Sequence, residues 1–134
     1  MSFADALTAI ESRFYTLWST SNADVTYGNV AFEPKANRPW IRLTVQHGDT
    51  NRAAVWPEYY RSTGVIFAQI FIPPNKGSKL ALTLADQVSA IWRGQQFSGI
   101  SCLSPSVNDV GVREGWYQVN VTCPYYRDEL LPAI

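Results

Sequence analysis

The sequence predicts an α+β domain with two helices packed on one face of a mostly antiparallel, mixed β-sheet. Three observations lead to this fold class. Apolar residues recur at helical spacing in residues 3–18 and again in residues 80–92. Residues 39–47 alternate apolar and polar side chains, as a half-covered strand does, and residues 61–73 are apolar on both alternating faces. The predicted order of elements is α-β-β-β-α-β-β.

The first helix begins at a capping residue, because Ser2 is followed three residues later by Asp5, where a capping box places its acid. The helix is expected to end near Trp18 or Ser19, and its apolar stripe consists of Phe3, Leu7, Ile10, Phe14, Leu17 and Trp18. Residues 19–28 are predicted to form a loop. Residues 29–32 are predicted to form a short strand that Pro34 stops.

The second predicted strand, residues 39–47, directs Ile41, Leu43 and Val45 toward the core. Its other face is expected to be partly wet or to contact a subunit, and it carries Trp40, Arg42, Thr44 and Gln46. Residues 48–60 are interpreted as a long interaction loop, since they are too many for a tight hairpin. The aromatic side chains of this loop are costly to leave in water.

Residues 62–73 form the most informative strand. Val65, Phe67 and Phe71 point to one face, and the opposite face carries Ile66, Ala68, Ile70 and Ile72. A strand that is apolar on both faces is covered on both faces. The following helix provides one cover, and a neighbouring subunit is a candidate for the other.

The second helix is predicted to start at Ser78 as its cap, after the strand-breaking prolines 73–74, and to end at Gly94. Two further strands are expected over residues 97–106 and 115–124, separated by a polar turn at residues 108–114. Residues 125–134 are interpreted as a C-terminal tail that docks on a partner or frays.

The composition indicates one domain, residues 1–134, without a strong preference for nucleic acid. Eleven basic and eleven acidic residues cancel, whereas dedicated nucleic-acid binders carry a basic excess. Residues 1–34 carry one base and four acids, and residues 35–61 carry five bases and two acids. This asymmetry has two interpretations. The two segments pair head-to-tail between copies of the chain, or their charges are simply solvated. Aromatic residues make up 13% of the chain, which predicts aromatic contact surface.

The sequence contains no recognisable catalytic, metal-binding or cofactor-binding motif. His47, with Asp49 nearby, is the single histidine, and no serine or cysteine stands in a nucleophile turn. Cys102 and Cys123 lack the spacing of a metal site and are expected to be reduced, buried and inert. No signal peptide or membrane-spanning segment is recognised, so we expect a soluble protein made in a cytoplasm.

The order of short motifs resembles the phage tail terminator family of long-tailed phages, the lambda-type, gpU-like minor tail proteins. The resemblance covers nearly the whole chain and is most distinctive in residues 61–124. The residues that carry it are Arg61-Ser-Thr-Gly64, Gln69-Ile-Phe-Ile-Pro73, Gly77, Leu84-Ala-Asp86, Gly115-Trp-Tyr-Gln-Val-Asn-Val121 and Pro124.

The resemblance implies a structural protein of the virion, not an enzyme. Such proteins form a ring that caps the head-proximal end of the tail tube and ends tube polymerisation. The resemblance implies that this ring is a homohexamer. The implied partners are copies of the chain, the major tail tube protein and the head–tail connector or neck protein. Genomic DNA would pass through the lumen without specific binding, and assembly would take place in the host cytoplasm.

Five residues are the candidate contacts with a ring neighbour or an adjacent tail ring, because aromatic residues and arginine dominate interface energetics. They are Arg52, Trp56, Tyr59, Tyr60 and Arg61. The alternative for the aromatic members is a loop folded back on its own sheet. Two other functions remain open: another head–tail joining or completion protein, and a small ligand-binding or hydrolytic domain that uses His47.

Overall fold

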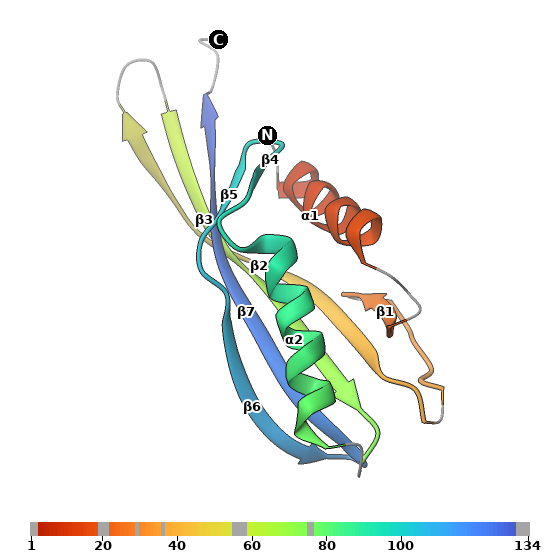
Figure 1. The fold of residues 1–134 in the computed structure, drawn as a ribbon. Coiled ribbons are helices and arrows are strands. Elements are labelled where there is room, and N and C mark those ends of the chain that lie inside the picture. Colours follow the sequence, from red (N-terminus) through yellow and green to blue (C-terminus); the bar gives the residue numbers. More distant parts are fainter. Residues whose placement is uncertain are drawn as a thin grey trace.

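The computed structural model describes residues 3–18, 22–28, 30–35, 37–54, 59–74 and 77–130, and it confirms the α+β class (Figure 1). Two helices accompany a curled, mixed seven-stranded sheet. In chain order the elements are α1 (Phe3–Leu17), β1 (Asp24–Tyr27), β2 (Trp40–Ala54), β3 (Tyr59–Ile72), α2 (Ser78–Trp92), β4 (Gln96–Phe97), β5 (Ile100–Cys102), β6 (Ser106–Arg113) and β7 (Trp116–Leu130).

Strand β3 occupies the middle of the sheet, whose order is β1-β2-β3-β7-β5-β4, with β6 also paired to β7. β3 is antiparallel to both of its neighbours. Along β7, β6 pairs with the first half and β5 pairs farther on, at Tyr125–Arg127. The β1–β2 pair is parallel, and every other strand pair is antiparallel.

Both helices lie on the same face of the sheet, with α2 across β3 and β7 and α1 beside it toward β1 and β2 (Figure 1). The alternation predicted for β3 is confirmed on this face, where Ile66, Ala68, Ile70 and Ile72 are at most 1% exposed. Helical spacing supplies the matching stripes, Ala6, Ile10 and Phe14 on α1 and Leu84, Val88 and Trp92 on α2. The core therefore lies between the two layers.

Within the described residues, no helix covers the opposite face of the sheet. Val65, Phe67 and Phe71 are only partly buried there. Trp40 was expected on a wet or subunit-facing surface, yet it is 8% exposed. Its ring stacks on Phe71 at 4.1 Å between centroids and also contacts Phe32 and Trp116. This aromatic cluster gives the uncovered face an apolar patch of its own.

The interpretation of residues 48–60 as a loop was wrong for most of that segment. β2 continues to Ala54 and β3 starts at Tyr59, so the two strands form one long hairpin, with Arg52 opposite Tyr60. The β2–β3 pairing continues past Gly48 and Asp49. A register shift between His47 and Thr50 accommodates the extra residue on β2. Residues 55–58 lie outside the described residues.

Two other boundaries near the N-terminal half differ from prediction. The short strand lies at Asp24–Tyr27, within the predicted loop, and residues 30–32 are not strand. Parallel pairing with Trp40–Leu43 fixes this position, and a long-range pairing of this kind leaves no local signature. Helix α2 begins after Gly77, which has φ +81°, and Ser78 does not cap it through its side chain. The expected cap Ser2 lies outside the described residues.

The C-terminal third contains more strand than predicted. Residues 106–113, expected mainly as a turn, form β6, and the turn is at Glu114 and Gly115, which both have positive φ. Residues 125–130, expected as a tail, continue β7 because they pair with Tyr59–Gly64 of β3. Residues 131–134 lie outside the described residues. The predicted helix terminator Gly94 is confirmed by its φ of +62°.

Gly64 provides a test of the packing between β3 and β7. A Cβ built on Gly64 would approach the buried ring of Tyr125 to 2.5 Å. We expect Gly64→Ala to lower the free energy of unfolding by about 1–3 kcal/mol, because Tyr125 must leave its place. Urea unfolding measures this difference. Gly28→Ala is the matched control, since its Cβ would meet only ordinary contacts at 3.6 Å; equal losses in both variants would contradict the packing argument.

Candidate assembly interface

The three longest strands extend beyond the helical layer as an arm. We define the arm as Thr50–Ala54, Tyr59–Thr63 and Tyr126–Leu130 of β2, β3 and β7 (Figure 1). A fifteen-residue strand spans about 50 Å, whereas a fifteen-residue helix spans about 22 Å. The helices therefore cannot cover the whole sheet. Four of the predicted contact residues, Arg52, Tyr59, Tyr60 and Arg61, belong to the β2 and β3 parts of this arm.

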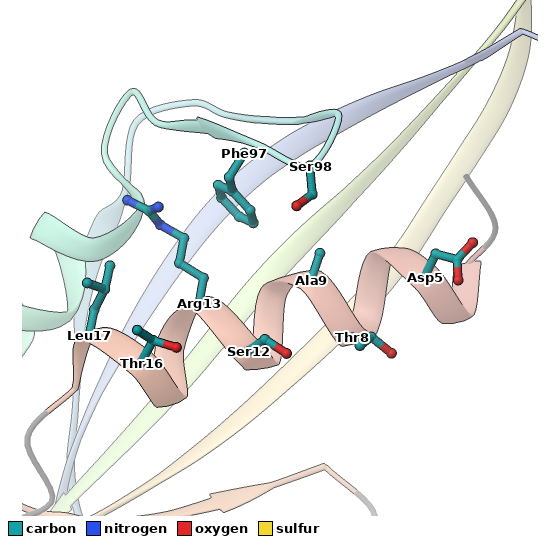
Figure 2. Close-up of a pocket in the computed structure, with 9 residues that line it drawn as sticks. All are labelled: Asp5, Thr8, Ala9, Ser12, Arg13, Thr16, Leu17, Phe97 and Ser98. Carbon is teal, nitrogen blue, oxygen red and sulfur yellow. The ribbon is translucent and has the colours of Figure 1, made fainter.

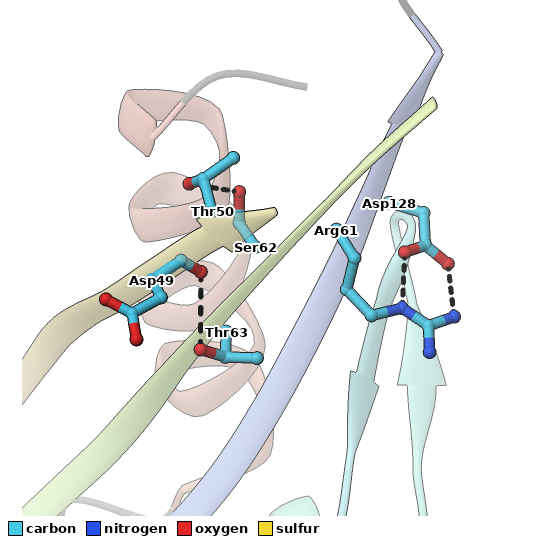
Figure 3. A network of polar contacts seen from close by, with 6 residues as sticks. All are labelled: Asp49, Thr50, Arg61, Ser62, Thr63 and Asp128. Carbon is cyan, nitrogen blue, oxygen red and sulfur yellow. Dashed lines mark hydrogen bonds and ion pairs between the residues drawn. The ribbon is translucent and has the colours of Figure 1, made fainter. Parts of the chain in front are cut away.

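Arg61 is held within the arm (Figure 3). Its Nε and Nη2 atoms donate hydrogen bonds of 2.8 and 3.0 Å to the two carboxylate oxygens of Asp128, directly across the β3–β7 pairing. The same guanidinium lies 4.3 Å from the ring centroid of Tyr126. A bidentate pair combined with a cation–π contact fixes the orientation of the side chain. Arg61 thus ties β3 to β7 before any partner is bound.

On the other side of β3, hydroxyl groups tie the strand to β2 (Figure 3). The Thr50 and Ser62 hydroxyls are 2.9 Å apart and hydrogen-bonded, and the Thr63 hydroxyl donates to the carbonyl oxygen of Asp49 at 3.4 Å. A Cβ at Gly48 would come within 2.8 Å of the Thr63 hydroxyl. The close approach of these strands therefore requires glycine at the register shift.

The first turn of α1 packs against the base of the arm. Arg127 of β7 is only 2% exposed, and its guanidinium lies 4.5 Å from the ring centroid of Phe3. The same ring meets His47 edge-on at 4.8 Å. An Nη1 atom of Arg127 is also 3.7 Å from a carboxylate oxygen of Glu129. A buried cation, an aromatic ring and an imidazole thereby join the helical layer to the projecting strands.

The structure brings most of the predicted contact residues to one place. The backbones of Arg52, Tyr59, Tyr60 and Arg61 all belong to the arm, with Arg52 opposite Tyr60 in register. Tyr60 is half-buried, and Trp56 lies outside the described residues. Sequence reasoning missed Asp128, Tyr126 and Arg127, which complete the arm from β7. Two adjacent tyrosines and three adjacent charged residues follow Pro124, and this run does not alternate as a half-buried strand does.

A second surface feature is a shallow hollow of about 550 Å³ between α1 and the β4–β5 hairpin (Figure 2). Arg13 crosses it, donating from Nε to the carbonyl oxygen of Ile91 at 2.9 Å, with its guanidinium 4.8 Å from the ring centroid of Phe97. The remaining lining is small or apolar, and Asp5 stands at the far end of the helix. This arrangement holds the hairpin against α1 and contains no nucleophile–base pair.

His47 is exposed at the base of the arm, and its one described ring contact is with Phe3. The described residues contain no cluster of three or more histidine, cysteine or acidic side chains suited to a metal ion. Cys102 and Cys123 are both buried and free, as predicted. The pKa of the Cys102 thiol is raised by its hydrogen bond with Cys123 and by burial, so this thiol is a poor nucleophile.

Most of the chain matches a known protein family. Residues 5–125 match the family described as "Phage tail terminator protein", so the chain belongs to the phage tail terminator family. No curated protein sequence matches it. Among solved structures, one chain aligns over 98% of this chain and 100% of its own length, with a TM-score of 0.66 and 19% identity. At that identity the likeness establishes the fold alone.

Family membership makes this chain a structural protein of the phage tail that works with other tail and head components. Neither described helix has the length and apolar character needed to cross a membrane.

The Arg61–Asp128 pair can be tested by a double-mutant cycle with Arg61→Ala and Asp128→Ala. Because Arg61 keeps a side-chain exposure of 48%, we expect a coupling energy of about 0.5–1 kcal/mol in urea unfolding. Amide exchange of the arm should accelerate more than that of the core. Arg113→Ala, an exposed arginine on β6, is the control. A coupling energy of zero would show that the pair does not stabilise the arm.

Proposed function

We propose that this protein caps the head-proximal end of the tail tube of a long-tailed, siphovirus-type phage. It assembles there as a closed ring, a homohexamer, which ends tube polymerisation and forms the joint to the head connector. The observation that carries the proposal is the family match across residues 5–125. The partners in this proposal are other copies of the chain, the major tail tube protein and the connector or neck protein.

The physical character of the chain supports this role. A closed ring needs two different contact surfaces on every subunit, and a projecting arm that lacks a helical cover is suited to pack on a neighbour. The net formal charge of zero suits a ring whose lumen conducts DNA, because many phosphate contacts would hold the DNA in place. The proposed location is the virion, at the tail end nearest the head.

The decisive experiment deletes the gene and examines the particles by electron microscopy. We expect tails of excessive and variable length, and full capsids without tails, because neither growth control nor joining operates. Purified protein added to the mutant lysate should restore joining. Normal tail length with failed joining would instead favour another head–tail completion protein, and normal particles would contradict both functions.

Trp56→Ala tests the predicted contact residue that lies between β2 and β3 in the sequence. We expect a folded monomer with nearly unchanged urea unfolding and a loss of assembly of at least about tenfold, since buried interface tryptophans commonly contribute 2 kcal/mol or more. Sedimentation with and without tail tubes measures assembly. Val30→Ala, an apolar residue that is 57% exposed away from the arm, is the control. An unfolded Trp56→Ala protein would show that this tryptophan belongs to the core.

His47→Ala separates the proposed function from a hydrolytic or ligand-binding one. The ring of His47 contacts Phe3, so we expect a small loss of stability, below about 1 kcal/mol, and unchanged tail joining. Complementation of the deletion by the variant measures joining. A variant that folds and joins normally would remove the alternative function. Abolished complementation by a normally folded variant would restore His47 as a functional residue.

A further inference from the structure

Two sets of exposed large apolar side chains lie on different elements of the fold. One set lies on α1, where Leu7 is 36% exposed and Tyr15 is 75% exposed. The other lies along α2 and β6, where Leu82, Val107 and Val112 are 42%, 43% and 67% exposed. In Figure 1, α1 and β6 lie toward opposite sides of the molecule, and α2 lies between them across the sheet. Two unlike apolar surfaces on one chain are what a head-to-tail contact between copies requires.

The first surface, the α1–β1 flank, consists of Leu7, Glu11, Tyr15 and Tyr27. The helical repeat aligns Leu7, Glu11 and Tyr15 at intervals of four residues. A hollow of about 340 Å³ lies beside them, lined by Glu11, Ser12, Tyr15, Thr16 and Tyr27. Two tyrosines and one acidic residue are among its lining residues.

Glu11 is the acidic member of this flank. It is half-buried, and it forms no ion pair with any cation in the described part of the chain. Arg13 follows closely in sequence but lies on the other flank of α1, committed to Ile91 and Phe97. Burial raises the pKa of the Glu11 carboxyl, which means that its charge is incompletely solvated. A cation delivered from outside would compensate it.

The second surface, the α2–β6 flank, consists of Lys79, Leu82, Arg93, Val107 and Val112. Val107 lies opposite Val121, a core residue, so its side chain points to the helical side of the sheet. Leu82 lies on the side of α2 away from Gln87, whose amide oxygen accepts a hydrogen bond from Asn22 near β1.

The charges of the α2–β6 flank complement those of the α1–β1 flank. Lys79 and Arg93 are exposed, and neither forms an ion pair within the described residues. One acid, Asp86, lies on the same side of α2 between them. The long side chains of lysine and arginine have apolar stems and charged ends. Such a side chain fits an apolar-walled hollow with a carboxylate inside.

We propose that the α1–β1 flank of one subunit binds the α2–β6 flank of a second copy, with Lys79 or Arg93 of that copy entering the hollow beside Glu11. The contact joins unlike surfaces, so it repeats from subunit to subunit and closes a ring when the rotation permits. This inference rests on the proposed function for its choice of partner. The arm remains available for the adjacent tail ring or for a second contact with the neighbour.

Cross-linking between mixed chains tests the geometry directly. One chain carries Tyr15→Cys and the other carries Leu82→Cys, and both are added to terminator-deficient tails before treatment with a short bismaleimide. The native Cys102 and Cys123 are 5% and 0% exposed, so only the introduced thiols react readily. We expect a heterodimer from the 15/82 pair and little from Tyr15→Cys with Gln87→Cys, which lies on the side of α2 that contacts Asn22. Equal yields, or a 15/15 product alone, would overturn the proposal.

Charge exchange tests the chemistry. We expect Glu11→Lys to weaken self-association by at least about tenfold, and Lys79→Glu or Arg93→Glu in the same chain to restore it, because the ion pair re-forms with reversed polarity. The isosteric Glu11→Gln should raise the urea midpoint of the monomer while weakening association, a combination that a purely structural role would not produce. Unchanged association of Glu11→Gln, or no restoration by either second substitution, would overturn the assignment.

These outcomes are separable from failure of the proposed function. If wild-type protein restores tail length and joining but the 15/82 cross-link does not form, the proposed function is retained and the contact between subunits lies on another surface. If the deletion leaves tails normal, the proposed function fails whatever the cross-linking pattern.

Discussion

The architecture depends on a mismatch in length between its two layers. β2, β3 and β7 contain about as many residues as either helix. A residue in a strand, however, advances more than twice as far along the chain axis as a residue in a helix. Two helices can therefore cover only part of one sheet face. The covered part holds the core, and the uncovered remainder becomes the arm and the open face.

An arm without a helical cover has to be kept ordered by its own side chains. Arg61 and Asp128 fasten β3 to β7, while the hydroxyl pair of Thr50 and Ser62 fastens β2 to β3. At the base, Arg127 is buried beside Phe3 and so links the arm to α1. Order established before binding lowers the entropic cost of assembly. Arg61, which the sequence suggested as a partner contact, thus has a role within the subunit.

The sequence was informative where the pattern is local and repetitive. Both helices and the two-faced apolar strand β3 followed from spacing alone, because side-chain period reports secondary structure directly. It misjudged segments whose structure depends on distant partners. Residues 48–54 and 125–130 read as loop and tail because their polar residues look like irregular chain, but β3 supplies hydrogen bonds to both. The candidate residues of β2 and β3 were selected from the sequence, whereas Tyr126, Arg127 and Asp128 were not, since nothing local connects them to Arg61.

The sequence by itself determined the α+β class, the buried stripes and the tail terminator family, because these depend on residue order and period. Tertiary structure alone decided that most of the supposed loop is paired strand, that Trp40 contacts Phe71 and Trp116, and that Glu11 lines a hollow without an ion pair among the described residues. Each of these depends on which strands and helices become neighbours. That choice is made by long-range packing, which residue spacing does not encode.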